Sequence, residues 1–346
     1  MSKTILVTGS TGYVGTWVVK YLLEDGYHVR ITVRDKSKSE KYAFIQKIAN
    51  DAAGEIEVFE ADLLKAGSYN DAASGCDAII HLASPFTLRF KDPVKELIVP
   101  ALQGTKNVLA AATASPTVKK VVLTSSVVSV YGDNIDMQEK GLQELSEDDF
   151  NESSTETHQP YSYSKVKAEL AAWDIAKQQS QWELVVINPA FVMGPPLTTN
   201  TNSESIQFMK DILRGKFITG APYLEIAFVD VRDAARAHIL ALKKEDAEGR
   251  YIIAERVIDF MSFTQLIKSL YPGKYPLPLM KTPKFMLYLV GWAFGLTTKY
   301  ISRNVGYHFK INNSKSKQDL KLVYSPFEAT IKDMIEAMKN LNLIKS

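Results

Sequence analysis

The sequence predicts an α/β fold, a Rossmann-type doubly wound parallel sheet with a smaller C-terminal lobe. Two observations indicate this class. Short β-rich runs alternate with helical patterns through the first half of the chain, which is the order of successive βαβ units. Several runs, such as TILVT and LVVIN, are apolar without alternation, as expected for strands that are covered on both faces.

The expected elements follow in chain order. We expect strands where β-branched and apolar residues cluster, at residues 5–7, 29–33, 56–59, 78–81, 121–124 and 184–188. Helices are expected at residues 16–23, 97–112, 164–178 and 232–243. Past residue 190 the alternation gives way to turn-rich and proline-rich stretches. We therefore expect a nucleotide-binding domain of residues 1–192 plus about 223–257, and a substrate-binding lobe of about 193–222 plus 258–346.

Composition excludes several classes of protein. The 346 residues are 46% hydrophobic and 23% charged with a formal net charge of +2, which argues against disorder and against a strongly basic nucleic-acid binder. The single cysteine, Cys76, excludes an intramolecular disulfide and a Cys-based zinc site, and it suits a cytoplasmic location. The five histidines lack metal-type spacing, so no metal site is expected.

The most apolar stretch, residues 285–296, is shorter than the roughly 20 residues that span a bilayer, so no membrane span is expected. We interpret it as a buried or substrate-facing helix, with a contact on a membrane surface as the alternative. Its aromatic side chains are expected in the lobe core, or else at the floor of an apolar substrate pocket: Phe285, Tyr288, Trp292 and Phe294. The long acidic segment 133–160 is expected to be a lid or, equally, a solvated insertion.

A glycine-rich turn joins the first expected strand to the first expected helix. Its spacing is GxxGxxG, at the first strand–helix junction of a βαβ pattern. A diphosphate needs backbone N–H donors at a helix N-terminus, and side chains would block that approach. A tight turn without a ligand is the alternative. The expected cofactor contacts here are Gly9, Thr11, Gly12, Tyr13, Val14 and Gly15.

The end of the second strand bears on the choice between NADP(H) and NAD. An acid at this tip would accept hydrogen bonds from the adenosine ribose, whereas an arginine can face a 2′-phosphate. Arg34 takes the tip position, and a shift of one residue would place Asp35 there instead. Lys41 belongs to a basic run behind Arg34 and is also expected to contact the cofactor. The pattern therefore favours NADP(H).

Two Tyr-xxx-Lys pairs overlap in the segment PYSYSK and the residues after it. Tyr161 precedes Lys165 by four residues, and Tyr163 precedes Lys167 by four. On a helix this spacing puts both side chains of a pair on one face. A nearby ammonium stabilises a phenolate and lowers the tyrosine pKa towards the range useful for proton transfer. Spacing alone does not choose between the pairs.

Several ordered motifs identify a family resemblance. Residues 1 to about 250 resemble an extended short-chain dehydrogenase/reductase through TGSTGYVG, ADL, HLASP, GTKNVL, VVLTSSVVSVYG, PYSYSK, INPAFVMGP and VDVRDAARAH. In that family the catalytic pair follows a proline, which implies Tyr161 and Lys165. The resemblance implies Ser126 as the catalytic serine, with Ser125 as its near neighbour. It also implies that Asn107 holds a proton-relay water, although a polar contact inside the helix is the alternative.

The resemblance implies further cofactor contacts along the strand ends. Asp62 and Leu63 should lie by the adenine. Leu82, Ala83 and Ser84, beyond the fourth strand, should follow the cofactor towards its ribose. Pro189 and Val192 should lie near the nicotinamide, and Thr124 is also expected to contact the cofactor.

Within this superfamily the chain looks most like dihydroflavonol reductases, cinnamoyl-CoA reductases and yeast-type carbonyl reductases. The implied activity is NADPH-dependent reduction of an aldehyde or ketone, with an apolar or aromatic substrate and a monomeric or homodimeric enzyme. Tyr131 stands where dihydroflavonol reductases usually have Asn or Asp, which argues against a flavonoid substrate. The alternatives are a nucleotide-sugar epimerase or dehydratase, a hydroxysteroid dehydrogenase, and a non-catalytic dinucleotide sensor.

Overall fold

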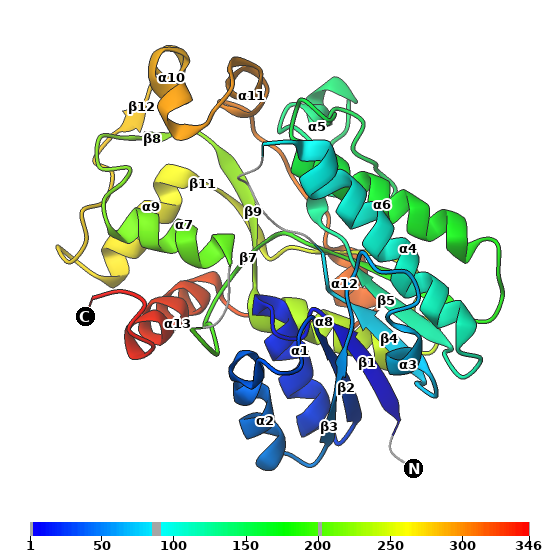
Figure 1. Ribbon diagram of the computed structural model, residues 1–346. Coiled ribbons are helices and arrows are strands. Elements are labelled where there is room, and N and C mark those ends of the chain that lie inside the picture. The colour runs from blue at the N-terminus through cyan, green and yellow to red at the C-terminus, as the bar shows by residue number, and fades with distance from the viewer. Residues whose placement is uncertain (1–2, 85–90, 200–202, 346) are drawn as a thin grey trace.

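The computed structural model describes residues 3–84, 91–199 and 203–345. Within these residues, seven parallel strands form the central sheet in the order β10-β6-β5-β4-β1-β2-β3 (Figure 1). The strand order reverses direction beside β1, so the carboxyl ends of β1 and β4 border the crevice in which doubly wound sheets bind ligands. The strands are β1 (Thr4–Thr8), β2 (His28–Val33), β3 (Glu55–Glu60), β4 (Ala78–His81), β5 (Lys120–Thr124), β6 (Glu183–Pro189) and β10 (Gly249–Ile253).

Helices cover both faces of this sheet (Figure 1). On one face pack α1 (Tyr13–Glu24), α2 (Ala43–Asn50) and α8 (Val231–Lys243). On the other pack α3 (Asn70–Ala73), α4 (Val99–Ala114) and α6 (Pro160–Ala176), with the π-helical turn η2 (Val94–Ile98) leading into α4. Alternate strand residues enter two separate cores, as with Ile5 on the α1 side and Leu6 on the α4 side. This arrangement explains why the strands read as continuous apolar runs.

The predicted fold class is confirmed, and all six expected strands fall in the central sheet. The seventh strand, β10, had no separate prediction, and neither had α2 and α3. The strand-like AFVDV segment is β9 (Glu225–Asp230), which pairs in a different sheet with β7 (Phe191–Met193) and β11 (Arg256–Asp259). The expected division into two units stays a prediction.

The second lobe is built around an aromatic core. Phe228 on β9 stacks on Phe263 at 5.1 Å between ring centroids, and Phe327 packs against both rings. A two-stranded sheet of β8 (Ala221–Pro222) and β12 (Lys281–Thr282) lies beyond it. The helices of this lobe are α7 (Glu204–Leu213), α9 (Phe260–Leu270), α10 (Lys284–Val290), η4 (Gly291–Phe294), α11 (Thr298–Asn304) and α13 (Phe327–Asn340). The short helix α12 (Ser314–Gln318) instead packs against β10 of the central sheet.

The expectation that the aromatic residues of segment 285–296 lie in the lobe core is wrong. In α10 and η4 only Leu287 and Gly291 are buried, whereas Phe285 is 67% exposed and Trp292 is 78% exposed. Tyr288 and Phe294 are also exposed. Among the described residues, no helix combines the length and apolar character that a bilayer crossing requires.

Candidate active site

The glycine-rich turn between β1 and α1 is shaped by close backbone contacts. Gly9 has φ +68°, and a Cβ there would lie 2.7 Å from the Ala83 backbone nitrogen. A Cβ on Gly15 would collide with the Gly9 carbonyl oxygen. Within the described residues no side chain caps the α1 N-terminus, and the buried Ser10 hydroxyl has no hydrogen-bond partner. A bare helix N-terminus with an unpaired hydroxyl beside it fits a diphosphate, which accepts several hydrogen bonds.

Tyr13 and Trp17 fix the position of α1 against the segment that follows β7. The Tyr13 hydroxyl donates to the Gly194 carbonyl at 2.5 Å, and Trp17 Nε1 donates to the Pro195 carbonyl at 3.0 Å. Burial raises the pKa of Tyr13 well above its ordinary value, so its proton stays in that bond. The Tyr13 side chain therefore acts in packing, and its backbone is the part that faces the turn.

The residues after β2 leave an arginine exposed and engage the neighbouring acid. Arg34 is exposed directly after the strand. The Asp35 carboxylate accepts hydrogen bonds from the Ser37 backbone nitrogen at 3.0 Å and hydroxyl at 2.5 Å, and it lies 3.1 Å from Lys38 Nζ. These contacts, led by the Ser37 hydroxyl, lower the pKa of Asp35 to about 2. Because the Asp35 carboxylate is bound within its own turn, Arg34 is the charged side chain available to a ligand at the end of β2.

Asn107 on α4 is bound to the segment expected near the adenine. Its Nδ2 donates to the Leu63 carbonyl at 2.6 Å, and its Oδ1 accepts from Gln103 Nε2 at 2.9 Å. Asp62 in turn accepts from the Leu64 backbone nitrogen at 2.9 Å. The Asn107 amide therefore holds this loop through Nδ2 and binds its own helix through Oδ1, which agrees with the polar-contact alternative for this residue.

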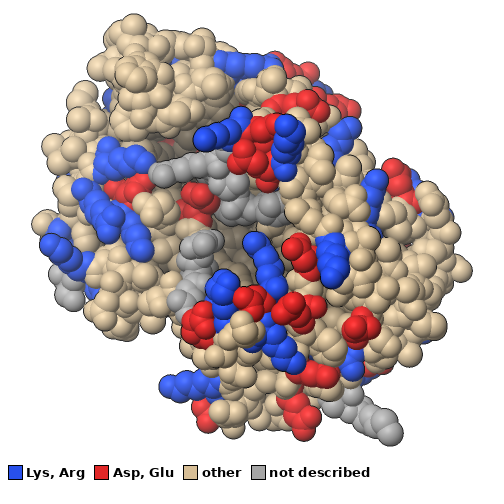
Figure 2. Space-filling model, in the orientation of Figure 1, with Lys and Arg blue, Asp and Glu red and all other residues tan. Residues whose placement is uncertain are grey.

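A small cavity at the carboxyl ends of β4 and β5 brings several predicted residues together. Four of its lining residues were expected to contact the cofactor or act in catalysis: Ala83, Ser84, Thr124 and Lys165. His81, which the sequence analysis did not assign, also lines it and bonds Thr8 Oγ1 through Nδ1 at 2.7 Å. Burial, together with the charge of Lys165, lowers the pKa of His81 to about 3. This histidine is neutral at physiological pH. Figure 2 shows the molecule hollowed on this face between its two lobes.

Tyr161 and Lys165 lie in the first two turns of α6. Pro160 starts the helix, and Gln159 before it adopts a left-handed conformation with φ 55°. Lys165 Nζ lies 6.0 Å from the centre of the Tyr161 ring. Burial raises the pKa of Tyr161, and it lowers the pKa of Lys165 to about 8 against the opposing charge of Glu169. Because the phenol and the amine are shielded from water, charges on the two groups would interact strongly.

The second Tyr-xxx-Lys pair lies differently. Lys167 Nζ is 5.2 Å from the centre of the Tyr163 ring, which is closer than in the first pair. Lys167 is exposed to solvent, whereas only 7% of the Lys165 surface is exposed. An exposed ammonium is strongly hydrated, and solvent screens its charge. Burial and the cavity, rather than spacing, separate the two pairs.

Ser126 and Pro189 meet at the carboxyl ends of β5 and β6. Ser126 Oγ accepts from the Val128 backbone nitrogen at 3.3 Å and donates to the Pro189 carbonyl at 3.4 Å, and both bonds are long. Ser125 is more deeply buried, with its Oγ 3.1 Å from Ser129 Oγ. The Ser126 hydroxyl is thus the more easily redirected of the two. Thr124 binds away from this point, since its Oγ1 lies 2.7 Å from His238 Nε2.

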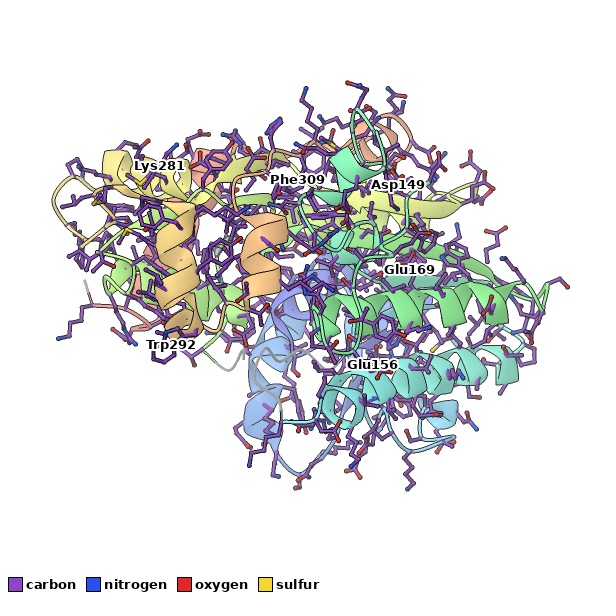
Figure 3. All side chains as sticks on the ribbon, turned by 90° about the horizontal axis from the view of Figure 1, so that it is seen from above. Asp149, Glu156, Glu169, Lys281, Trp292 and Phe309 are labelled. Atoms are coloured by element: carbon purple, nitrogen blue, oxygen red, sulfur yellow. The ribbon has the colours of Figure 1, made fainter. Side chains whose placement is uncertain are left out.

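Beneath these residues lies a buried polar network that the sequence analysis missed. Glu169, one turn after Lys165 on α6, forms an ion pair with Arg250 on β10 at 2.6 Å. The second Glu169 oxygen accepts from Ser129 Oγ at 2.5 Å and from Asn188 Nδ2 at 3.0 Å (Figure 3 labels Glu169). Arg250 also donates to the carbonyls of Glu147 and Asp149. The network connects β10, β6, the turn η3 (Val127–Ser129) and the helix that carries Tyr161.

The acidic segment 133–160, which contains α5 (Asp136–Glu139), is a structured insertion. Asp133 is fully buried and accepts hydrogen bonds from His158 at 2.9 Å, Arg303 at 2.6 Å and Asn304 at 2.6 Å. Burial alone would raise the pKa of Asp133, but these hydrogen bonds hold it below its ordinary value. The expectation of a merely solvated insertion is therefore wrong. The segment joins α11 of the lobe to the start of α6.

Lys165→Met is expected to stabilise the protein without cofactor at neutral pH. Because burial lowers the pKa of Lys165 from 10.5 to about 8, the folded chain holds this proton less tightly than the unfolded chain. Between those pH values the unfolded state binds more protons, so wild-type stability rises with pH there. The variant should be more stable than the wild type by about 3 kcal/mol below this window, and the difference should vanish above it. Urea unfolding across pH checks this, with Lys167→Met as the exposed control. If the difference in stability between Lys165→Met and the wild type does not vary with pH, burial does not lower the pKa of Lys165.

The first strand–helix junction carries a glycine-rich turn, and the strand ends carry a Tyr–Lys pair whose lysine is buried. Together these features define a dinucleotide-binding α/β enzyme. Comparison with known proteins identifies its family. The sequence model of the family described as "NAD dependent epimerase/dehydratase family" matches residues 5–254. The chain belongs to this family. The predicted resemblance to extended short-chain dehydrogenases/reductases is confirmed.

Individual relatives include plant reductases. The chain is similar to cinnamoyl-CoA reductase CAD2 of Medicago truncatula, at 33% identity over 98% of this chain and 96% of the relative. It is also similar to dihydroflavonol 4-reductase of Arabidopsis thaliana, at 33% identity over 80% of this chain and 71% of the relative. Among solved structures, Gre2 from Candida albicans in complex with NADPH aligns with a TM-score of 0.77 at 29% identity, covering 98% of this chain and 99% of that one.

Proposed function

We propose that this protein reduces an aldehyde or ketone to an alcohol with NADPH. The observation that carries the proposal is the placement of Tyr161 and Lys165 beside the cavity at the ends of β4 and β5. That point lies next to the glycine-rich turn, since Gly9 touches the backbone of Ala83. The relatives named as reductases, and the Gre2 structure with NADPH, support the same cofactor and reaction type.

The residues divide the chemistry between them. NADPH, when bound, supplies the hydride that reaches the carbonyl carbon. Tyr161 donates its phenolic proton to the carbonyl oxygen. Because burial alone raises the pKa of Tyr161, the phenolate left behind needs a nearby positive charge, which Lys165 provides. The Ser126 hydroxyl turns from the Pro189 carbonyl to hydrogen-bond the developing alkoxide.

The substrate is expected to be apolar or aromatic. Tyr131 is buried and packs against Phe309 at 4.8 Å between ring centroids. Burial raises the pKa of Tyr131, so the phenol stays neutral. A buried aromatic ring at this position, in place of the Asn or Asp expected of dihydroflavonol reductases, supports a substrate with few hydroxyl groups over a flavonoid.

Arg34→Ser is expected to weaken NADPH binding about 10- to 100-fold and to leave NADH binding nearly unchanged. Arg34 would lose a charge-assisted hydrogen bond to the 2′-phosphate, which contributes about 1.5–3 kcal/mol. The check is the KM for each cofactor with one carbonyl substrate. Lys36→Ser, which removes an exposed charge two residues away, is the matched control and should change KM only slightly. Equal losses for NADPH and NADH would contradict the role given to Arg34.

The main rival on this scaffold is a nucleotide-sugar epimerase or dehydratase, which retains its oxidised cofactor. The exposed Arg34 and the engaged Asp35 speak against NAD as the preferred cofactor. Net consumption of NADPH with a carbonyl substrate distinguishes the two functions, because an epimerase consumes none. The same assay distinguishes a non-catalytic dinucleotide sensor.

A further inference from the structure

Exposed apolar side chains are concentrated on one segment of the second lobe. Of the fourteen large hydrophobic residues that are exposed among the described residues, nine lie between residues 279 and 294. We call these nine the apolar patch: Leu279, Met280, Phe285, Met286, Tyr288, Leu289, Val290, Trp292 and Phe294. The other five are scattered along the chain, as single exposed residues are on most proteins. A contiguous exposed patch marks an interaction surface.

The patch belongs to a folded segment that is anchored from beneath. Leu287 on α10 packs with Ile301 and Val305 in a small separate core. Lys284 Nζ donates to the Ser302 carbonyl at 3.0 Å and lies over the Tyr307 ring at 4.7 Å. With its inner side held in this way, the segment presents Phe285, Leu289 and Trp292 outward at 67%, 70% and 78% exposure. Their exposure therefore reflects the direction in which α10 and η4 face.

The chain around the patch carries charge of one sign. No Asp or Glu occurs between Asp259 and Asp319, whereas this stretch holds eight Lys and one Arg. Arg303 is engaged by Asp133 and Glu139 of the insertion. Three exposed lysines lie nearest to the patch in the chain: Lys274 precedes it, Lys281 lies within it and Lys299 follows it. Lys299 lines a pocket together with Asp136, Glu139 and Glu152 of the insertion, so Lys274 and Lys281 carry the positive charge of the patch. Figure 3 shows Lys281 and Trp292 at opposite ends of the α10–η4 segment.

We propose that the apolar patch docks on the surface of a bilayer that contains anionic lipid. A short helix with aromatic and leucine side chains on one side and lysines around it lies in the plane of the interface. Trp and Tyr are favoured at the level of the lipid headgroups, where Trp292 and Tyr288 would lie. Each lysine near an anionic leaflet adds to the attraction. The segment inserts only into the headgroup region of one leaflet and does not cross the bilayer.

A second copy of the chain fits this surface less well. A twofold contact places the same patch, with the same lysines, on both sides of the interface. Lys274 and Lys281 would then face a rim of equal charge with no acid from this stretch to balance it. Like charges brought together across an interface oppose association. An anionic membrane supplies the complementary charge that a second copy lacks.

Vesicle flotation of the full-length protein tests the proposal without using its enzymatic activity. The probes are vesicles of phosphatidylcholine alone and vesicles in which part of the lipid is phosphatidylserine. We expect flotation with the phosphatidylserine vesicles and weaker flotation with phosphatidylcholine. Leu289→Ser combined with Trp292→Ser should weaken binding about tenfold or more. Lys274→Glu combined with Lys281→Glu should weaken binding severalfold on the anionic vesicles alone. Val323→Ser, at an 81% exposed site outside the patch, should float like the wild type.

Thermal unfolding of each variant, expected to match the wild type, shows that the serine changes leave the fold intact. Absence of flotation with either kind of vesicle would overturn the proposal. So would wild-type flotation of the Leu289→Ser, Trp292→Ser variant. A patch variant that turns a dimer into a monomer, with no vesicle binding by the wild type, would identify a second copy as the occupant instead.

Discussion

Tyr161→Phe is expected to bind NADPH with nearly unchanged affinity and to lose turnover by about 10²- to 10⁴-fold, the range typical of a positioned general acid. The change removes one hydroxyl and keeps the ring that packs in this half-buried position. The proton for the alkoxide would then have to come from solvent. Steady-state kinetics with a fixed aldehyde substrate, together with NADPH binding by fluorescence, separates lost catalysis from lost binding.

Tyr163→Phe is the matched control for this experiment. Tyr163 has a lysine at the same offset, and its Lys167 lies closer to the ring than Lys165 lies to Tyr161. Only the position beside the cavity distinguishes Tyr161, because Lys165 lines the cavity and Lys167 is exposed. We expect Tyr163→Phe to keep most of the wild-type turnover. The assignment would be reversed if this variant, and not Tyr161→Phe, were inactive.

Arg250→Met is expected to destabilise the fold by about 3–5 kcal/mol, because it leaves the buried Glu169 carboxylate without its cation. Arg250 is 6% exposed and Glu169 is 1% exposed. The arginine also donates to the carbonyls of Glu147 and Asp149, so the insertion loses two of its hydrogen bonds to β10. Denaturant unfolding without cofactor measures the effect. Glu169 would then interact chiefly with Lys165, which lies one turn away on α6. Because the negative charge of Glu169 would no longer be neutralised by Arg250, the pKa of Lys165 should rise.

Two further variants show whether the cause is the unpaired charge. Lys243→Met breaks the surface pair with Asp25, in which the side chains are 45% and 38% exposed, and it should cost less than about 1 kcal/mol. Arg250→Met combined with Glu169→Leu removes both buried charges and should recover part of the lost stability. If the double variant is less stable than Arg250→Met alone, the loss of Arg250 does not act through Glu169.

The parts of the fold that sequence alone predicted are those with a strong local signal. The strands are apolar over their whole length because both faces of the sheet are covered, and the glycine-rich turn is required by backbone contacts at Gly9 and Gly15. The strand β10 has no such signal, since its sequence GRYII opens with a glycine and an arginine. That arginine forms an ion pair with Glu169, 81 positions earlier in the chain, and no local pattern connects the two residues.

The predicted site was incomplete for the same reason. The spacing of Tyr161 and Lys165 is local and could be read directly, whereas the burial that separates this pair from Tyr163 and Lys167 depends on the whole fold. The prediction for the apolar segment was also wrong about burial, because its aromatic side chains are exposed. Composition shows that residues 285–296 are apolar, but the direction in which α10 faces is set by the contacts of Leu287 with Ile301 and Val305.

Transfer of deuterium from NADPH labelled at C4 of the nicotinamide tests the central claim most directly. The protein, NADPH carrying deuterium at either C4 position in turn, and a panel of aldehydes and ketones are incubated, and the alcohol is analysed by mass spectrometry. A carbonyl reductase is predicted to consume NADPH and to place deuterium from one C4 position on the carbinol carbon. Tight binding of the cofactor with no net oxidation across the panel, or an alcohol product without deuterium from either label, would contradict it.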